Sequence, residues 1–288
     1  MIFTVDLALA EARARIPLQE ARLLLQHVLA MPHAQLSAHP ERVLDEAQTI
    51  AFQTLLTRRH VGEPIAYLIG EWEFYGLPFR VTPDVLIPRP ETELLVDIAI
   101  EKIKPGDSVL DLGTGSGCVA VSIANQLAFS KVAATVTAVD ISPATLAVAQ
   151  QNANNLGVTV RWIQSDWFAA LTVLRGADSE NELVEVERFS LIVSNPPYIS
   201  AGDPHLSQGD LRHEPSRALA SGQDGLDAIR HIVKNAPCHL QLGGWLFFEH
   251  GYDQAAAAAA LLAEAGFSQI EHRLDLAGIS RVTGGRLV

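Results

Sequence analysis

The stretch VLDLGTGSGC, residues 109–118, joins an apolar run to a predicted helix that starts near Cys118. Gly113, Gly115 and Gly117 permit positive φ and allow a ligand to approach the backbone closely. The first turn of the following helix has unpaired N–H groups, which favour an anionic group. The stretch therefore predicts a cofactor-binding loop at the end of a strand. A tight strand-to-helix turn without a ligand is the structural alternative.

Around this loop, apolar strands alternate with amphipathic helices. The predicted strands are residues 108–112, 135–140, 159–164, 190–194 and 244–249. This alternation is typical of an α/β fold, in which crossover helices connect the strands of a parallel sheet. Two later runs, 268–274 and 281–287, predict a closing antiparallel pair.

The chain before about residue 60 has a different pattern, with apolar residues at helical spacing. Pro17, Pro32 and Pro40 punctuate this segment, which predicts a small helical bundle. Because proline is favoured in the first turn of a helix, we expect Pro40 to open the helix that contains Leu44 and Phe52.

Aromatic and β-branched runs flank Gly76 and Pro78, which predicts a β-hairpin. We therefore divide the chain into an N-terminal helical domain (1–66), a β-hairpin linker (67–90) and an α/β domain (91–288). The length of 288 residues suits two domains, since single domains usually hold about 100–200 residues.

Composition restricts the class of protein. A hydrophobic share of 48% indicates a substantial core, and the net charge of −12 disfavours a broad grip on nucleic-acid phosphates. Cys118 and Cys238 are far apart, which favours neither a disulfide framework nor a zinc site. The N-terminus lacks a signal-peptide pattern, and no apolar run reaches the roughly 20 residues of a membrane span. We expect a cytoplasmic protein without a metal.

The type of cofactor follows from the loop and from the acids on later strands. The loop reads GxGxG, whereas dinucleotide-binding folds use GxGxxG. Asp140 ends the next predicted strand, where a carboxylate can accept the hydroxyls of a ribose, although it could instead cap the helix near Pro143. Further on, Trp167 could cover an adenine and Asp166 could accept its amino protons, or the indole could simply pack in the core.

The segment LIVSNPPYIS ends another buried strand in the tetrapeptide Asn195, Pro196, Pro197 and Tyr198. A planar nitrogen is a poor nucleophile because its lone pair is delocalised, so an enzyme must hold both of its N–H groups. The side-chain oxygen of Asn195 and the carbonyl of Pro196 can accept them, while Tyr198 offers a face to the flat group. The tetrapeptide predicts alkylation of an amide or aromatic amino nitrogen, and an ordinary turn is the alternative.

Together these motifs resemble class I (Rossmann-like) methyltransferases that act on nitrogen. More specifically, IPRPETE (87–93), DLGTGSG, SNPPYIS, EPSRALASGQDGLDAIR, FFEHGYDQ and DLAGISRVTGGR resemble the PrmC/HemK family of release factor glutamine methyltransferases, in that family's order. NPPY alone is shared with adenine methyltransferases of nucleic acids, whereas IPRPETE and ALASGQDGL are more discriminating.

The resemblance implies an S-adenosylmethionine-dependent enzyme, with S-adenosylhomocysteine as product, that methylates the glutamine of the GGQ motif in class I peptide chain release factors. It implies that Gly113, Thr114, Gly115, Ser116, Gly117, Asp140, Trp167 and Asn195 contact the cofactor, and Asp166 joins them by our reading of its strand end. It also implies that residues 195–198 hold the glutamine, that the helical domain helps dock the release factor, and that the protein is a monomer.

Three other functions remain open from the sequence. A sister enzyme could methylate glutamine on a ribosomal protein, and IPRPETE favours the release factor over it. A nucleic-acid adenine N6-methyltransferase usually needs a basic channel, which the acidic balance does not indicate. A non-catalytic binding module would not require an intact NPPY segment.

Two segments depart from, or add to, this pattern. Residues 168–188 carry Asp178, Glu180, Glu182, Glu185 and Glu187, and we expect a solvated insertion loop there. Residues Arg89, Glu91 and Glu93 could close the site over the methionine part of the cofactor, or the acids could serve the first turn of a helix.

Overall fold

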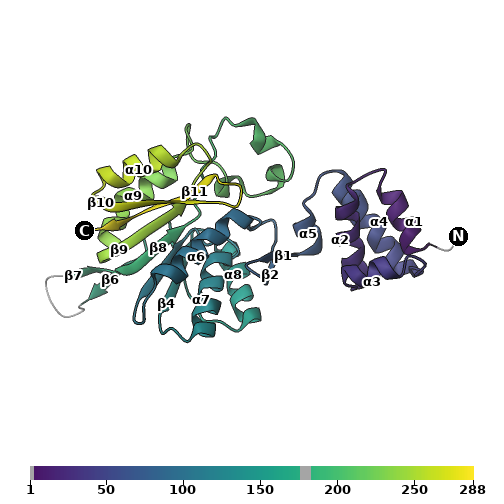
Figure 1. Cartoon of the computed structure of the whole chain (residues 1–288), viewed down its shortest axis with the longest axis horizontal. Helices are drawn as coiled ribbons and strands as arrows, with labels where there is room; N and C mark the ends of the chain where they lie inside the picture. Colours follow the sequence, from purple (N-terminus) through teal and green to yellow (C-terminus); the bar gives the residue numbers. More distant parts are fainter. Residues whose placement is uncertain (1–2, 176–182) are drawn as a thin grey trace. The chain divides into compact units, whose positions relative to one another are not determined.

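The computed structural model describes residues 3–175 and 183–288 and divides into two compact units (Figure 1). Unit 1 runs to Trp72 and includes Ser207–His213. Unit 2 consists of Glu73–Leu206 and Glu214–Val288. A short, late segment of the chain therefore belongs to the first unit.

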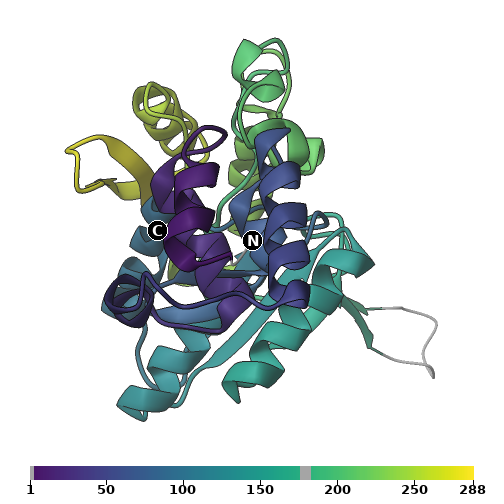
Figure 2. The same cartoon turned by 90° about the vertical axis from the view of Figure 1, so that its right-hand side faces the viewer.

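Unit 1 is a helical bundle, as its apolar spacing predicted (Figure 2). Its helices are α1 (Val5–Ala12), α2 (Leu18–Leu29), α3 (His33–Ala38), α4 (Glu46–His60) and α5 (Ile65–Ile69). Leu24, Leu25 and Phe52 are fully buried in one apolar core. The bundle is held mainly by this packing, because isolated helices of such lengths are marginal in water.

The prediction that Pro40 opens the helix containing Leu44 was wrong. α4 begins at Glu46, because the side chain of Asp45 accepts a hydrogen bond from the Gln48 N–H while the Gln48 side chain accepts one from the Asp45 N–H. This capping box satisfies two N–H groups at the helix start. Leu44 lies before the helix and is buried, with its N–H bonded to the carbonyl of Phe3.

Arginines hold the returning segment Ser207–His213 to the rest of unit 1. Arg59 donates to both carboxylate oxygens of Glu20, at 2.6 and 2.8 Å, and to Asp210 at 2.8 Å. Arg212 donates to the carbonyl of Val61 at 2.9 Å. The guanidinium of Arg59 is largely buried, so its two carboxylate partners compensate for the loss of water.

The predicted hairpin is present as β1 (Glu71–Phe74) and β2 (Leu77–Arg80). Tyr75 and Gly76 connect the strands with φ of 55° and 71°, the left-handed geometry of a tight hairpin turn. Phe74 and Phe79 are fully buried in the core of unit 2. The hairpin is thus packed by its aromatic side chains.

A seven-stranded sheet forms the centre of unit 2, in the order β10-β11-β9-β8-β3-β4-β5. Its strands are β3 (Ser108–Leu112), β4 (Thr135–Asp140), β5 (Arg161–Gln164), β8 (Phe189–Ser194), β9 (Leu240–Glu249), β10 (Phe267–Leu274) and β11 (Ser280–Leu287). β5, β4, β3, β8 and β9 pair in parallel, whereas β11 pairs antiparallel with β9 and β10. Both the parallel sheet and the closing antiparallel pair were predicted, but β9 starts four residues earlier than Gly244.

Helices cover both faces of this sheet (Figure 1). They are α6 (Glu93–Lys102), α7 (Cys118–Ser130), α8 (Pro143–Leu156), α9 (Asp227–His239) and α10 (Ala255–Glu264). Alternate residues of each strand enter opposite cores, as with Phe247 beside α6 and α7 and Phe248 beside α9 and α10. Within the part of the chain that the structure describes, no helix has the length and apolar character needed to cross a bilayer.

The expectation of a plain loop over residues 168–188 was wrong for its two ends. β6 (Thr172–Arg175) and β7 (Leu183–Val186) pair antiparallel, and Phe168 and Leu171 are buried in the core beside α9. Strand pairing satisfies backbone groups that a loop would leave to water. Arg161 forms an ion pair with Glu187 at 2.5 Å. Asp178, Glu180 and Glu182 lie outside the described residues.

The capping box yields a test of unit 1. We expect Asp45→Ala to lower the free energy of unfolding of the bundle by about 1 kcal/mol, because it leaves the Gln48 N–H at the start of α4 unsatisfied. Asp45→Asn is the matched control, since asparagine caps equally well. Hydrogen exchange at the amides of the first turn of α4 measures the difference. Equal protection in the two variants would contradict the role of the cap.

Candidate active site

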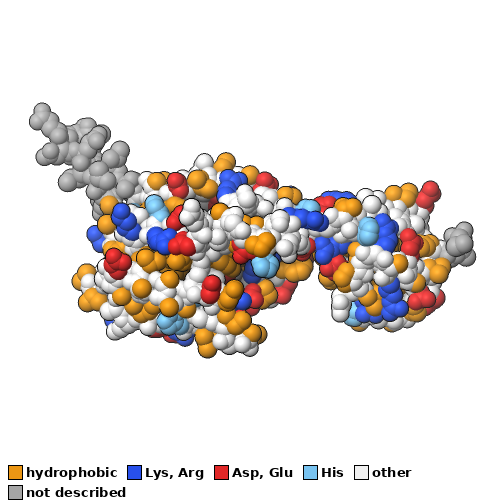
Figure 3. Space-filling model, turned by 90° about the horizontal axis from the view of Figure 1, so that it is seen from above, with side chains coloured by type: hydrophobic (Ala, Val, Ile, Leu, Met, Phe, Trp, Pro, Cys, Tyr) orange, Lys and Arg blue, Asp and Glu red, His pale blue; other side chains and the backbone are white. Residues whose placement is uncertain are grey.

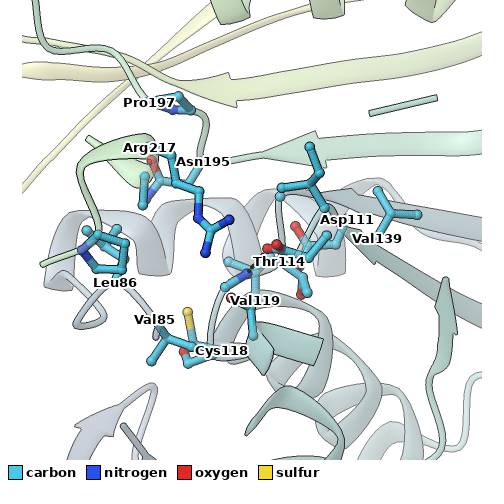
Figure 4. Close-up of a pocket in the computed structure, with 18 of the residues that line it drawn as sticks. Val85, Leu86, Asp111, Thr114, Cys118, Val119, Val139, Asn195, Pro197 and Arg217 are labelled. Atoms are coloured by element: carbon cyan, nitrogen blue, oxygen red, sulfur yellow. Dashed lines mark hydrogen bonds between the residues drawn. The ribbon is translucent and has the colours of Figure 1, made fainter. Parts of the chain in front are cut away.

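A cavity of about 300 Å³ lies at the carboxyl ends of the parallel strands (Figure 4). The chain proceeds from β3 to β4 on one side and later returns to β8 on the other, so the strand order reverses beside β3. Ligands of open α/β sheets bind at such a reversal. Gly113, Asp140, Trp167 and Asn195, which the sequence singled out from four strand ends, all line this one cavity.

The glycine loop is shaped by its backbone. Gly113, Gly115 and Gly117 have φ of 70°, 57° and 80°. A Cβ at Gly117 would lie 3.0 Å from the Cβ of Ala149, so a side chain there would collide with α8. Gly113, Thr114, Gly115 and Ser116 line the cavity, whereas Gly117 is the N-cap of α7. The loop can therefore offer backbone to a ligand where side chains would intrude.

Asp140 organises this loop. Its two carboxylate oxygens accept hydrogen bonds from the N–H groups of Ser142, at 2.9 Å, and Gly115, at 3.1 Å. Burial raises its pKa, and these bonds act in the opposite direction. Ser142, not Asp140, caps α8, since its hydroxyl accepts from the Thr145 N–H. Each carboxylate oxygen of Asp140 keeps a lone pair with which it could accept a ligand hydroxyl.

Asp111 is a buried acid beneath the loop that the sequence did not assign to the site. Its carboxylate accepts a hydrogen bond from the Thr114 hydroxyl at 2.6 Å and lines the cavity. Burial raises its pKa to about 7, although hydrogen bonds from Thr114 and from the Ala120 N–H lower it. Thr114 is one of the residues that we expect to contact the cofactor. In the structure its hydroxyl proton is donated to Asp111 and is not available to a ligand.

Asp166 and Trp167 both line the cavity after β5. Asp166 is exposed, and Trp167 is half-buried with a φ of 50°. A large side chain in the left-handed region costs about 1–3 kcal/mol and is typical of functional sites. The Ser165 hydroxyl donates to the Trp167 carbonyl at 2.8 Å. The indole ring lies 3.6 Å from where a Cβ on Gly113 would stand, so it closes the cavity over the glycine loop.

The NPPY segment forms another side of the cavity, to which Asn195 and Pro197 contribute (Figure 4). The side-chain amide of Asn195 donates to the Thr92 hydroxyl at 3.0 Å. Pro196 is buried, and neither it nor Tyr198 is part of the cavity lining. The Tyr198 hydroxyl donates to Glu249 at 3.0 Å. The structure thus brings Asn195 to the cavity and turns the Tyr198 hydroxyl toward the buried end of β9.

Arg217, Thr92 and Glu249 were also missed as individual residues. In Figure 4 the guanidinium of Arg217 extends into the cavity, and its charge partly offsets the rise that burial causes in the pKa of Asp140. Thr92 lines the cavity and is buried, as is Glu249. All three belong to motifs of the family resemblance. A charged residue that ends an apolar strand, as Glu249 ends β9, was the available signal.

The charged residues of IPRPETE form contacts within unit 2. Arg89 pairs with the buried carboxylate of Glu214, and Glu214 also accepts the Ile87 N–H at 3.0 Å. Glu93 accepts the N–H of Tyr75 at 2.8 Å. These residues therefore have partners within unit 2, and among the residues of this motif Pro88 and Thr92 line the cavity.

Comparison with known proteins identifies the family of this chain. Residues 6–70 match a family described as the PrmC N-terminal domain, and residues 109–195 match a methyltransferase domain. A release factor glutamine methyltransferase of Bordetella pertussis is 48% identical over 94% of this chain and 96% of its own length. One of Burkholderia pseudomallei is 49% identical over 93% of this chain and 91% of its own. The chain belongs to the release factor glutamine methyltransferase family.

Solved structures support the fold of this family member. A 16S rRNA methyltransferase of T. thermophilus, solved with AdoMet and guanosine, aligns with a TM-score of 0.51 at 21% identity, over 76% of this chain and 50% of its own. At that identity the likeness shows the fold alone. It places the chain among proteins built on the class I methyltransferase sheet.

As a release factor glutamine methyltransferase family member, the chain uses S-adenosylmethionine as methyl donor. The residues fit such a cofactor. The loop backbone is open to a ligand, Asp140 has free acceptor capacity for a ribose, and Trp167 supplies a flat apolar surface. Burial raises the pKa of the Cys118 thiol in the same cavity to about 12, so this sulfur stays protonated and is a weak competitor for an electrophilic methyl group.

The raised pKa of Asp111 predicts how stability depends on pH. Between about pH 4 and about pH 7 the folded state binds a proton that the unfolded chain has released, so this contribution to stability is lost as pH rises. Asp111→Asn should therefore gain stability relative to wild type, by about 1 kcal/mol or more, from about pH 5 to about pH 8. Urea unfolding followed by tryptophan fluorescence measures this, since Trp162, Trp167 and Trp245 lie in unit 2. Parallel pH curves for the two proteins would contradict it.

Proposed function

We propose that this enzyme transfers a methyl group from S-adenosylmethionine to the side-chain amide nitrogen of the glutamine in the GGQ motif of class I peptide chain release factors. The observation that carries the proposal is the hydrogen bond from the Asn195 amide to Thr92, at the edge of the cavity. It uses the donor side of the Asn195 carboxamide and leaves the carbonyl oxygen available for a substrate N–H. The curated relatives bear the name of this activity.

The chain supplies orientation more than acid–base chemistry. The Asn195 side-chain oxygen and the Pro196 carbonyl accept the two N–H groups of the glutamine amide, which aims the nitrogen lone pair out of the amide plane. Pro196 and Pro197 have no N–H that would compete for the substrate oxygen or for these acceptors. When bound, S-adenosylmethionine supplies a methyl carbon on a positively charged sulfur, which is already an activated electrophile. As the carbon–nitrogen bond forms, the carbon–sulfur bond breaks and leaves a neutral thioether, and the methylated nitrogen, now acidic, releases one of its two protons to solvent, so neither a metal nor a strong base is needed.

The proposed cofactor contacts follow the cavity. Gly113, Thr114, Gly115, Ser116 and Gly117 provide the loop, Asp140 accepts the ribose hydroxyls, and Asp166 and Trp167 receive the adenine. Asn195 lies where the cofactor and substrate sites meet. Shared lining of one cavity supports all of these assignments except Gly117, whose part is to start α7.

The proposed division of labour follows the chain. Residues 1–66 dock the release factor, residues 67–90 form a hairpin linker, and residues 91–288 carry out methyl transfer. The match of residues 6–70 to an N-terminal domain of this family supports a separate domain in this part of the chain. On the face shown in Figure 3, acidic and basic side chains are interspersed, and the net charge is −12. We therefore propose that the protein makes no direct contact with nucleic acid. We also propose that it acts in the cytoplasm.

Transfer of label tests the acceptor. Incubation with methyl-labelled S-adenosylmethionine should label a class I release factor and should not label one in which the GGQ glutamine is replaced. Ribosomal subunits and tRNA serve as parallel acceptors. Equal labelling of both release factors would refute the proposed acceptor. Labelling of ribosomal protein would favour the sister activity, and labelling of RNA would favour an adenine methyltransferase.

Two variants separate the cofactor site from the substrate site. Asn195→Ala should lower kcat by about 100-fold while S-adenosylhomocysteine affinity changes by only a few fold, because the nucleophile loses its orientation. Asp140→Asn should instead weaken S-adenosylhomocysteine by about 10- to 100-fold, because a charged acceptor is lost. Calorimetric titration and single-turnover rates measure the two effects, with the surface variant Asp227→Asn as control. Unchanged turnover in Asn195→Ala would disprove its assigned role.

A further inference from the structure

Four polar side chains from three segments that are distant in sequence form one hydrogen-bonded chain beside the cavity. Thr92 precedes α6, Asn195 and Tyr198 follow β8, and Glu249 ends β9. The Asn195 amide donates to the Thr92 hydroxyl at 3.0 Å, and this hydroxyl donates to Glu249 at 2.6 Å. The Tyr198 hydroxyl donates to the other carboxylate oxygen at 3.0 Å. Thr92 and Glu249 are both at least 98% shielded from solvent.

The direction of each bond follows from the chemistry of the carboxylate. An ionised carboxylate can only accept, so the single hydroxyl proton of Thr92 is committed to Glu249. The Thr92 oxygen can then only accept from Asn195, which must present its NH₂ group. A carboxamide is otherwise close to symmetrical in shape and can rotate to exchange its oxygen and nitrogen. The buried charge thus selects one of the two orientations.

We propose that Glu249 is a positioning residue that sets, through Thr92, which end of the Asn195 carboxamide faces the substrate. With Glu249 ionised, the Asn195 oxygen faces the cavity and accepts an N–H of the substrate amide. With the carboxamide reversed, two NH₂ groups would meet, and the acceptor would be lost. Through Tyr198 the same carboxylate holds the other end of the NPPY segment. This inference rests on the proposed function for the identity of the substrate amide.

Protonation of Glu249 would remove the constraint. A protonated carboxyl group can donate to the Thr92 oxygen, which frees the Thr92 proton for the Asn195 oxygen and allows the reversed carboxamide. Burial raises the pKa of Glu249 to about 7. Among the neighbouring charges, Glu91 raises the pKa of Glu249 and Arg281 lowers it. Arg281 and Arg89 act in the lowering direction on the pKa of Tyr198. The Cys118 thiol, which also interacts with Glu249, remains protonated. The ionised, productive form therefore increases as pH rises through about 7.

Neighbouring groups hold the NPPY segment in place without affecting the direction of the hydrogen bonds among Asn195, Thr92 and Glu249. The Tyr198 carbonyl accepts a hydrogen bond from the Gln254 side chain at 3.0 Å. A Cβ on Gly225 would lie 2.2 Å from that carbonyl oxygen, so the loop before α9 packs directly on the segment. Because this support is independent of Thr92, changing the Thr92 hydroxyl should alter hydrogen-bond direction more than loop position.

A matched pair at Thr92 tests the inference. Thr92→Ser keeps the hydroxyl, whereas Thr92→Val has nearly the same shape without it. We expect Thr92→Ser to retain the rise of kcat from about pH 6 to about pH 8, because it keeps the hydroxyl. Thr92→Val should lower kcat by about tenfold and lose that rise, with KM for S-adenosylmethionine changed little. Glu249→Gln should also flatten the pH profile. Wild-type kcat and pH dependence in Thr92→Val would overturn the inference.

A readout without turnover separates this inference from the proposed acceptor. The side-chain ¹⁵N–H₂ signals of Asn195, assigned by their absence in Asn195→Asp, should titrate near pH 7 in wild type and in Thr92→Ser. They should not titrate in Thr92→Val. This result would support the positioning role even if no release factor were labelled. A lack of labelling would refute only the proposed function. Absence of titration in wild type would overturn the positioning role even if labelling succeeded.

Discussion

The parallel pairing of β3 with β4 on one side and β8 on the other is the constraint on which the active site depends. It brings the carboxyl ends of these strands to one edge, so Gly113, Asp140 and Asn195 meet although they are far apart in sequence. A buried hydrogen bond from the Ser194 hydroxyl to the Leu112 carbonyl, at 2.8 Å, fixes the ends of β3 and β8 together. A slip of one residue would turn each side chain to the other face and separate these groups.

Buried carboxylates are the second element of the site. Asp111 and Glu249 each end or nearly end an apolar strand, and each is almost completely removed from water. Burial raises the pKa of both to about 7 because it disfavours the ionised form. A few hydrogen bonds act in the opposite direction and stabilise the ionised form of each acid. Asp111 receives bonds from the glycine loop and the start of α7, and Glu249 receives them from Thr92 and Tyr198. The acids therefore connect the stability of unit 2 to the geometry of the loops around its cavity.

Unit 1 depends on packing and on a few charged contacts. Its helices bury a single apolar core, and the capping box at Asp45 determines where α4 begins. Arg59 bridges Glu20 of α2 and Asp210 of the returning segment, so this unit is completed by residues that come late in the chain. A reading of the chain in linear order would not include that segment in the bundle.

The sequence by itself determined the class of fold and which strand ends carry the candidate site residues. Strand and helix periodicity is local, and the glycines, Asp140 and NPPY are each recognisable within a few residues, so their positions at the strand ends were predictable. Other features were not predictable: α4 begins after Asp45 and not at Pro40, β6 pairs with β7, and β9 starts earlier than expected. Each of them depends on which partner a backbone group finds in the folded chain. The tertiary structure alone decided that Thr92, Arg217 and Glu249 join the site, because their partners come from distant segments. Hydrogen-bond direction within that buried group depends on solvent exclusion, which arises only when the chain is folded.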